Sequence, residues 1–311
     1  MPWTADDIPS QTGKTFIITG ANSGIGYEAA LQLAGKEARV VLACRDQAKG
    51  QSALDAIRAA HPSASLAVME LDLAELKSIR RCADAARAAY PALHGLVNNA
   101  GVMAIPYRKT ADGFEMQFGT NHLGHFALTG MLLELLLATP GARVVSVSSN
   151  AHKFGAMRWD DLQRQRSYGK WLAYAQSKLA NLLFAFELQR RLAAAGAGAI
   201  SVACHPGYAA TNLQAAGPRM QGSTIAETVM EVANRLFAQS AAMGALPTLY
   251  AATAADVQGG DYIGPDRFGE QWGYPHKVQS NARARDLEAQ RRLWEISERL
   301  TGVHYEALQR A

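Results

Sequence analysis

The sequence predicts a doubly wound α/β fold in which a mostly parallel, seven-stranded sheet carries helices on both faces. Short runs rich in β-branched residues alternate with Ala- and Leu-rich helical segments. The runs are apolar throughout, which is typical of parallel strands covered on both sides. With 311 residues, 49% of them apolar, the chain can bury one large core. Right-handed crossovers between the strands complete the arrangement.

Seven runs have the length and composition of strands. They are residues 15–19, 39–43, 66–71, 95–98, 143–148, 199–204 and 260–265. After the sixth run, Gly and Pro cluster over residues 205–222, which predicts a loop. Helices are expected around 224–238 and 241–254. The charged segment 283–300 has apolar positions at helical spacing, which indicates a surface helix.

Charge and cysteine content exclude several classes of protein. The net charge is +4, but the basic residues are scattered, so nucleic-acid binding is not expected. Cys44, Cys82 and Cys204 lie far apart, which is typical of a reduced intracellular protein without a metal site. The N-terminus is polar, and the most apolar run, 126–138, contains Glu134 and is too short to span a bilayer. We therefore expect a cytoplasmic protein without a membrane anchor.

A glycine-rich turn follows the first predicted strand. The segment TGANSGIGYEA, residues 19–29, contains G-x-G-x-x-A and leads into a helical pattern. Glycines permit the tight turn and let a pyrophosphate approach the backbone, and the start of the helix presents free N–H groups to it. The turn therefore predicts a dinucleotide site. The residues expected to contact the cofactor here are Gly20, Asn22, Ser23, Gly24, Ile25 and Gly26.

The end of the second predicted strand indicates which dinucleotide is bound. In the NAD form of this fold an acidic residue stands there, but here Cys44 occupies the position and Arg45 follows. A guanidinium beside a neutral residue suits a 2′-phosphate, so NADP is expected over NAD. Asp46 is expected to cap the next helix. The alternative is that Arg45 is an ordinary solvated charge.

Two further strands end in residues that can reach the cofactor. ELDLAE places Asp72 there, where it either accepts from an adenine amino group or caps a helix. LVNNAG ends in Asn98 and Asn99, whose amides either stabilise the end of the sheet or contact the cofactor. The cofactor contacts expected from these segments are Asp72, Leu73, Asn99, Ala100 and Gly101.

Several motifs occur in a fixed order along the chain. They are TGANSGIG at 19–26, NNAG at 98–101, NHLGHF at 121–126, SVSSNAH at 146–152, YAQSK at 174–178 and HPG at 205–207. Together they resemble the short-chain dehydrogenase/reductase family, over about residues 13 to 213. Within the family, ACRD, SKLANLLF and the closing LWEISERLTGV resemble the branch of retinol dehydrogenases and WW-domain oxidoreductases.

The resemblance implies a catalytic set. By motif position it is Asn121, Ser149, Tyr174 and Lys178, the last two of which also contact the cofactor. Ser149 is preferred to Ser148 because the family's serine is the second of the pair, and neighbours on a strand point to opposite faces. The segment HPGYAAT resembles the family's loop over the nicotinamide. It adds Pro206, Gly207 and Thr211 as cofactor contacts.

These residues have expected roles in carbonyl reduction and in its reverse, alcohol oxidation. Tyr174 supplies a proton to the substrate oxygen, and Lys178, one helical turn away, is expected to lower the pKa of the tyrosine and to reach the nicotinamide ribose. Ser149 stabilises the charge that develops on that oxygen. Asn121 anchors a water that passes protons onward from Lys178. NADPH supplies the hydride.

The chain shows no internal repeat and no low-complexity linker, which predicts one domain with a C-terminal elaboration. Residues 1–12 are an N-terminal extension, and residues 13–311 form a single Rossmann-type catalytic domain. Within that domain, 213–240 is the expected substrate-binding loop and helix region, and 266–311 is a C-terminal extension. The stretch between the catalytic serine and tyrosine is long and can cover the helices through which relatives often dimerise. A monomer and a homodimer therefore both stay open.

Aromatic residues and methionines near the catalytic serine predict an apolar substrate pocket. The candidate pocket residues are Met103, His152, Phe154 and Tyr208. A lipophilic ketone or aldehyde, or the corresponding alcohol, is the expected substrate. Two alternatives are an NADP-binding sensor or interaction protein with little turnover, and a related enzyme that reduces a carbon–carbon double bond.

Overall fold

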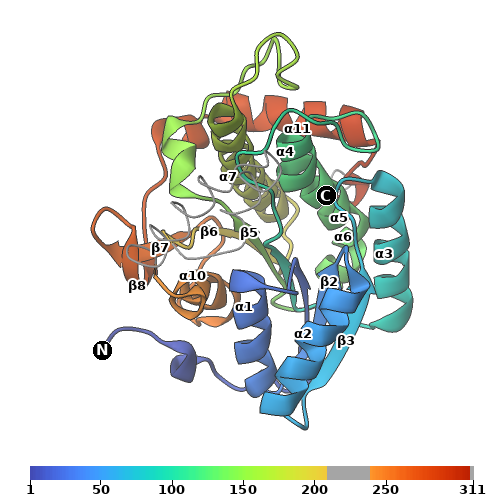
Figure 1. Cartoon of the computed structure of the whole chain (residues 1–311), viewed down its shortest axis with the longest axis vertical. Helices are drawn as coiled ribbons and strands as arrows, with labels where there is room; N and C mark the ends of the chain where they lie inside the picture. Colours follow the sequence, from blue (N-terminus) through green and yellow to red (C-terminus); the bar gives the residue numbers. More distant parts are fainter. Residues whose placement is uncertain (209–238, 309–311) are drawn as a thin grey trace.

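The structure, a computed structural model, describes residues 1–208 and 239–308. Its centre is one eight-stranded sheet with the strand order β3-β2-β1-β4-β5-β6-β7-β8 (Figure 1). The strands are β1 (Thr15–Thr19), β2 (Arg39–Cys44), β3 (Ser65–Glu70), β4 (Gly95–Asn98), β5 (Arg143–Val147), β6 (Ile200–Cys204), β7 (Tyr262–Arg267) and β8 (Trp272–Lys277). All neighbouring pairs are parallel except β7 and β8. The predicted doubly wound fold is therefore confirmed.

The predicted count of seven strands is wrong by one, because the sequence pattern does not show β8. This strand pairs antiparallel with β7 at the edge of the sheet. Its sequence, WGYPHK, contains Gly273 and Pro275, residues that weaken a strand pattern. Proline is tolerated on an edge strand. The short hairpin with β7 brings this segment into antiparallel pairing, so it forms a strand without an apolar run of its own.

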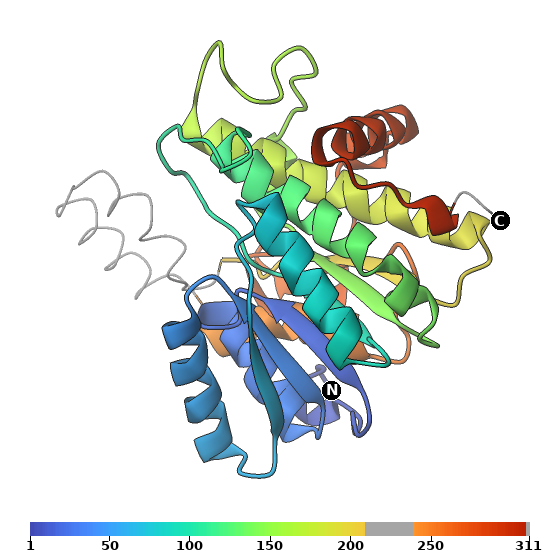
Figure 2. The same ribbon diagram turned by 90° about the vertical axis from the view of Figure 1, so that its right-hand side faces the viewer.

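Helices cover both faces of the sheet. They are α1 (Gly24–Gly35), α2 (Gln47–Ala60), α3 (Leu76–Ala89), α4 (Met116–Phe118), α5 (Gly124–Met131), α6 (Leu133–Leu137), α7 (Lys170–Ala194), α10 (Ala241–Thr253) and α11 (Leu287–Thr301). The helices α1, α2 and α10 pack on one face, and α3, α5 and α7 pack on the other (Figures 1 and 2). The helix predicted at 224–238 lies outside the described residues.

The predicted surface helix α11 forms an outer layer over α7 (Figure 2). Its Trp294 packs against Phe126 of α5 and Phe184 of α7, with ring centroids 5.2 and 6.0 Å apart. Tyr305 closes the cluster, 4.4 Å from Trp294. One face of α11 is therefore core. Across residues 1–208 and 239–308, no helix combines the length and the apolar character that a membrane crossing requires.

The strand order brings the chemistry-bearing motifs to one edge of the sheet. β1 pairs with β2 on one side and with β4 on the other, so the direction of winding reverses at β1. In open α/β sheets, ligands bind in the crevice beyond the carboxyl ends of the strands at such a point. The turns that follow β1, β4, β5 and β6 meet there, and α7 runs alongside them.

Candidate active site

A cavity of about 670 Å³ opens at the carboxyl edge of the sheet. Its wall is built from the turns after β1, β4, β5 and β6, from one face of α7, and from the tip of the β7–β8 hairpin. Most of the residues predicted from the sequence lie on this wall. They are Gly20, Asn22, Ser23, Gly24, Ile25, Gly26, Asn99, Ala100, Gly101, Met103, Ser149, Phe154, Tyr174, Lys178, Pro206, Gly207 and Tyr208.

The glycine turn lets the backbone form one end of the cavity. Gly24 has a φ of 56°, in the left-handed region that L side chains rarely adopt. A Cβ on Gly26 would lie 2.5 Å from Asn99 Nδ2 and 2.6 Å from Gly20 O, so only glycine lets α1 approach the sheet this closely. The first-turn N–H groups of α1 have no intrahelical acceptor. The cradle therefore fits the pyrophosphate of a dinucleotide.

The ends of β1 and β4 are locked together beside this turn. Thr19 Oγ1 accepts from the backbone N–H groups of Asn99 and Ala100, each at 2.9 Å, and Asn99 Nδ2 donates to Thr19 O at 2.8 Å. Asn98 instead donates to Thr129 Oγ1 of α5 at 3.0 Å. The two amides thus divide the roles that the sequence left open: Asn98 braces the sheet against α5, and Asn99 faces the cavity.

His125 extends this lock to the catalytic region, a contact that the sequence analysis missed. Its Nδ1 lies 2.9 Å from Asn121 O and its Nε2 lies 2.9 Å from Thr19 Oγ1. Burial lowers the pKa of His125 to about 4, so the ring is neutral at pH 7. A carbonyl oxygen can only accept, so the proton sits on Nδ1 and Thr19 donates to Nε2. In the sequence, only the repeated His of NHLGHF could have pointed to this contact.

Ser149, Tyr174 and Lys178 converge on the cavity from two elements. Ser149 lies two residues after the end of β5 and shares a side-chain hydrogen bond with the Tyr174 hydroxyl on α7. Lys178 Nζ lies 5.8 Å from the centroid of the Tyr174 ring and donates to Val147 O at 3.1 Å. The Tyr174 and Lys178 side chains are almost completely buried, at 5% and 3% exposure. An apolar helix therefore presents a phenol and an ammonium toward one small space.

The pKa of Tyr174 differs from the sequence-based expectation. Burial raises the pKa to about 12, and the hydrogen bond with Ser149 only partly opposes that rise. Burial also lowers the pKa of Lys178 to about 8. Desolvation disfavours the charged forms of both side chains. Tyr174 therefore holds its proton at neutral pH, as a proton donor must.

Asn121 lies behind the cavity wall, in a π-helical turn (Gly119–Leu123) that leads into α5. Its Oδ1 accepts from Val102 N at 2.8 Å, and its Nδ2 donates to Val102 O and to Ser177 Oγ, each at 2.9 Å. A Cβ on Gly101 would lie 3.0 Å from Asn121 Oδ1 and 3.7 Å from Lys178 Nζ. Asn121 thus fixes the backbone that separates it from the lysine.

The motifs and their geometry agree with comparisons to known proteins. The family model described as short chain dehydrogenase matches residues 14–222. The chain belongs to the short-chain dehydrogenase/reductase family. Retinol dehydrogenase 12 of Mus musculus is 42% identical over 294 residues, covering 94% of this chain and 88% of the relative. Retinol dehydrogenase 14 of Mus musculus is 40% identical over 303 residues, covering 94% and 86%.

Membership of the retinol dehydrogenase branch is thereby confirmed, and this short-chain dehydrogenase/reductase is an NAD(P)-dependent oxidoreductase. A solved structure of an uncharacterised protein from Mycobacterium paratuberculosis is 42% identical, with a TM-score of 0.81, over 98% of this chain and 99% of the other. A short chain dehydrogenase from Shigella flexneri complexed with NADP is 21% identical, with a TM-score of 0.61, over 82% and 98%. The second likeness supports the fold alone.

Some residues predicted for this dehydrogenase/reductase do not line the cavity. Arg45 is exposed just after β2, with no hydrogen bond or ion pair to another described residue. Asp46 caps α2 through Lys49 N, as predicted. Asp72 accepts from Ala74 N at 2.9 Å in the turn before α3, whose N-cap is Glu75, so Asp72 does not cap this helix; Leu73 is buried. Thr211 and most of the region 213–240 lie outside the described residues.

The substrate pocket requires one correction. His152 does not line the cavity: it is fully buried, with its Nδ1 2.7 Å from Ser149 O. It lies in the 3-10 turn Asn150–Phe154 that Ser149 caps, and the turn points it inward. Sequence reasoning missed Trp171 and Gln271, which do line the wall. Gln271 belongs to the hairpin that leads into β8, so the missed strand also hid a wall residue.

Proposed function

We propose that the protein is an NADPH-dependent reductase of lipophilic aldehydes and ketones, which also oxidises the corresponding alcohols. The observation that carries this proposal is the convergence of Ser149, Tyr174 and Lys178 on one cavity that ends at the glycine turn. Arg45 supports the choice of NADPH, because its exposed guanidinium follows β2, where a 2′-phosphate would lie. We propose the cytoplasm as the compartment.

Residues of the chain would hold the dinucleotide along the carboxyl edge of the sheet. The start of α1 at Gly24 suits the pyrophosphate, and Lys178 suits the ribose nearest to the catalytic tyrosine. Pro206 and Gly207 line the part of the cavity that suits the nicotinamide. Bound there, NADPH supplies a hydride to the carbonyl carbon.

Proton transfer is assigned to Tyr174. Its hydroxyl is protonated at neutral pH and would donate to the substrate oxygen as negative charge develops there. Ser149 would hydrogen-bond the same oxygen, since it already pairs with the Tyr174 hydroxyl. Lys178, with a pKa near 8, is suited to restore the proton. Asn121 is proposed to hold the water that resupplies Lys178, from its place behind Gly101.

The cavity lining supports a lipophilic substrate. Met103, Phe154, Trp171 and Tyr208 contribute large side chains to its wall. Phe154 is 79% exposed and Trp171 is 51% exposed, so apolar surface lines the route by which a substrate enters. An aldehyde or ketone with a long or aromatic tail gains from covering these rings, whereas a small polar carbonyl does not.

The test follows NADPH absorbance with a panel of aldehydes, ketones and quinones, and repeats the panel with NADH. We expect turnover, with kcat/KM rising as the apolar tail lengthens. Tight NADPH binding without turnover of any substrate would favour a sensor or interaction protein. Consumption of NADPH by an enone that keeps its carbonyl intact would favour a carbon–carbon double-bond reductase.

A further inference from the structure

We propose that Glu270, at the tip of the β7–β8 hairpin, is a positioning residue that fastens together the two loops flanking the reacting groups and so holds Ser149 in place. The inference rests on the proposed function, because it concerns the same site. It assigns a role to a hairpin that none of the predicted catalytic motifs includes.

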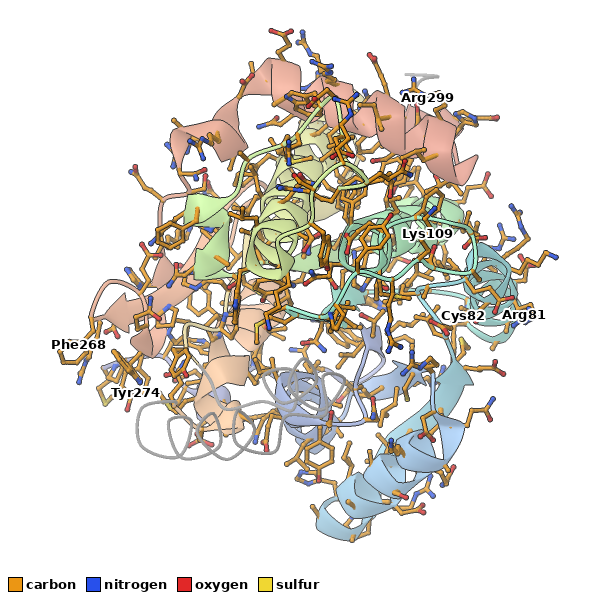
Figure 3. The ribbon with its side chains drawn as sticks, turned by 45° about the horizontal axis from the view of Figure 1, so that its top comes forward. Arg81, Cys82, Lys109, Phe268, Tyr274 and Arg299 are labelled. Atoms are coloured by element: carbon orange, nitrogen blue, oxygen red, sulfur yellow. The ribbon has the colours of Figure 1, made fainter. Side chains whose placement is uncertain are left out.

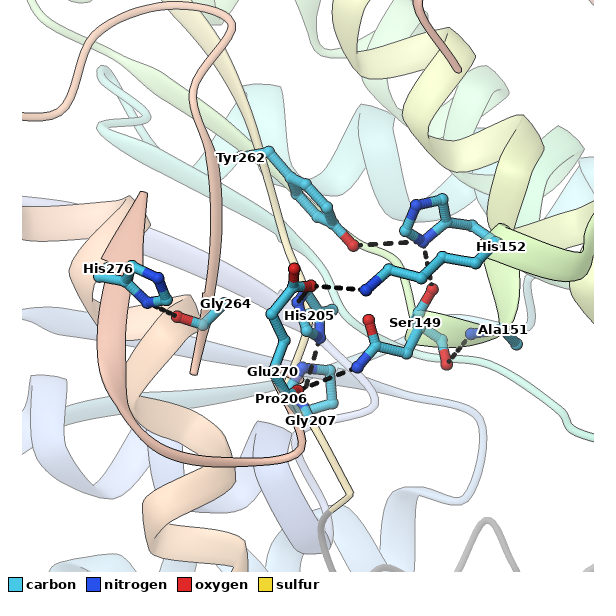
Figure 4. Close-up of polar contacts among 12 residues, drawn as sticks. Ser149, Ala151, His152, His205, Pro206, Gly207, Tyr262, Gly264, Glu270 and His276 are labelled. Atoms are coloured by element: carbon cyan, nitrogen blue, oxygen red, sulfur yellow. Dashed lines mark hydrogen bonds and ion pairs between the residues drawn. The ribbon is translucent and has the colours of Figure 1, made fainter. Parts of the chain in front are cut away.

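The first loop held by Glu270 is the 3-10 turn Asn150–Phe154, which Ser149 caps. Asn150 Nδ2 donates to the backbone oxygen of Glu270 at 2.9 Å. Lys153 Nζ lies 3.1 Å from Glu270 Oε2. Figure 4 shows these contacts converging on Glu270 from the turn. Because the turn is tied near both its beginning and its end, the Ser149 hydroxyl at its start is held against Tyr174.

The second loop runs from the end of β6 along the cavity. His205 Nε2 lies 3.1 Å from Glu270 Oε2, and Gly207 N donates to His205 Nδ1 at 3.3 Å (Figure 4). The next hairpin residue, Gln271, accepts from Tyr208 N through its backbone oxygen at 2.8 Å. A Cβ on Gly207 would clash with that same oxygen. The hairpin tip is therefore pressed directly against the loop that would cover the nicotinamide.

Charge makes this contact stronger than a neutral hydrogen bond. Burial opposes ionisation of Glu270, but the hydrogen bonds from His205 and Lys153 prevail and lower its pKa to about 2. Burial lowers the pKa of His205, and Gly207 N already donates to its Nδ1, so the neutral ring donates from Nε2. A carboxylate that accepts from both loops forms charge-assisted bonds. The nearby titratable groups His152, Tyr262 and His276 are bonded elsewhere.

Among the described residues, the apolar side chain at the hairpin tip is exposed and lies against Trp272 of the same hairpin, with ring centroids 5.6 Å apart. Phe268 is 78% exposed and lies at the edge of the molecule in Figure 3, whereas Tyr274 of β8 is partly buried and packs against the core. Phe268, Gly269 and Glu270 have successive φ values of 49°, 64° and 67°. Non-glycine residues keep the left-handed conformation only where their surroundings impose it. The polar contacts of Glu270 and Gln271 with the two loops supply such surroundings here.

The experiment compares Glu270→Gln with Asp261→Asn. The first variant keeps the shape of the side chain and removes its charge. The control breaks a similar pair at the base of the same hairpin, Asp261 with Lys277 at 2.9 Å, away from this cavity. Because a small misplacement of reacting groups slows the chemistry, we expect Glu270→Gln to lower kcat about tenfold while KM for NADPH changes less than about threefold. The control should leave both constants unchanged.

Hydrogen exchange gives a reading that does not depend on turnover. In Glu270→Gln, amide exchange should accelerate at Ala151, Gly207 and Tyr208, and in Asp261→Asn it should not. Glu270→Gly, which relieves the left-handed backbone, should behave like Glu270→Gln; unchanged kcat in both variants would overturn the inference. Unchanged exchange at the three amides would overturn it as well. If the wild-type protein turns over no substrate, the proposed function is contradicted. The exchange rates of the three amides would still show whether Glu270 holds the two loops.

Discussion

Tyr174 is the residue whose surroundings most restrict what it can do. Its hydroxyl is buried, bonded to Ser149 and protonated at neutral pH. We predict that Tyr174→Phe lowers kcat by about a thousandfold, because a positioned proton donor contributes about 10²- to 10⁴-fold. The dissociation constant for NADPH, measured by fluorescence, should stay within about twofold, since the ring remains.

The matched control for this change is Tyr250→Phe on α10, which loses only a hydroxyl bond to Asp256. It should retain wild-type kcat. Activity that persists in Tyr174→Phe would show that the proton comes from another group.

Arg45 decides the cofactor preference in the proposed function. It is exposed and bonded to no described residue, so its guanidinium is free to meet a 2′-phosphate. We predict that Arg45→Ala lowers kcat/KM for NADPH roughly tenfold to a hundredfold, the value of a lost charge-assisted hydrogen bond, and leaves that for NADH unchanged. Arg58→Ala, in the last turn of α2, should change neither. An unaltered NADPH preference in Arg45→Ala would refute the assignment.

At the scale of elements, the segment from the π-helical turn into α5 makes the protein sensitive to acid. Burial lowers the pKa of His122 to about 3 and that of His125 to about 4. Both rings are neutral when folded, so the unfolded chain binds more protons below about pH 6.5. This stability is present above pH 6.5 and is lost as the pH falls toward 4, at about 1.4 kcal/mol per pH unit for each histidine.

We therefore predict that His122→Phe reduces the loss of stability between pH 7 and pH 5, measured as urea midpoints. Phenylalanine suits the site because His122 already stacks on Phe118. The substitution removes the hydrogen bond between His122 and Ser297, but the Ser297 hydroxyl still donates to Leu293 O. The matched control is His304→Gln, which removes a histidine from the protein surface. If His122→Phe and the wild type lose the same stability between pH 7 and pH 5, His122 is not a source of the acid sensitivity.

Prediction of elements succeeded where the pattern was local and apolar. All seven strand runs identified in the sequence are strands, within one or two residues at their ends. β8 was missed because its pairing comes from a hairpin and not from its own composition. His152 was wrongly placed in the substrate pocket for a related reason. The turn capped by Ser149 decides which way the His152 side chain points, and a periodic sequence pattern does not predict such a turn.

At the scale of the whole molecule, α11 completes the core. Trp294 is 2% exposed, lies among Phe126, Phe184 and Tyr305, and carries the Arg191 guanidinium 4.4 Å above its ring. We predict that Trp294→Ala lowers the free energy of unfolding by about 3–5 kcal/mol, measured by urea titration. The surrounding side chains cannot fill the space that the lost indole ring leaves.

Leu287→Ala provides the control on the same helix, since Leu287 is 53% exposed. Its unfolding free energy should change by less than about 0.5 kcal/mol. Trp294→Ala should keep its kcat, because α11 does not line the cavity. A stability change of similar size in both variants would show that α11 is not part of the core.

The sequence by itself determined the fold class, the family and the identity of the motifs. This is because apolar runs indicate which segments are buried, and glycine spacing indicates local backbone conformation. Only the tertiary structure decided how these motifs meet. It raised the pKa of Tyr174 where the sequence predicted a lower value, since desolvation depends on everything packed around a group. It also joined Glu270 to His205 and Lys153, residues 65 and 117 positions away along the chain. Contacts over such distances leave no periodic pattern in a single sequence.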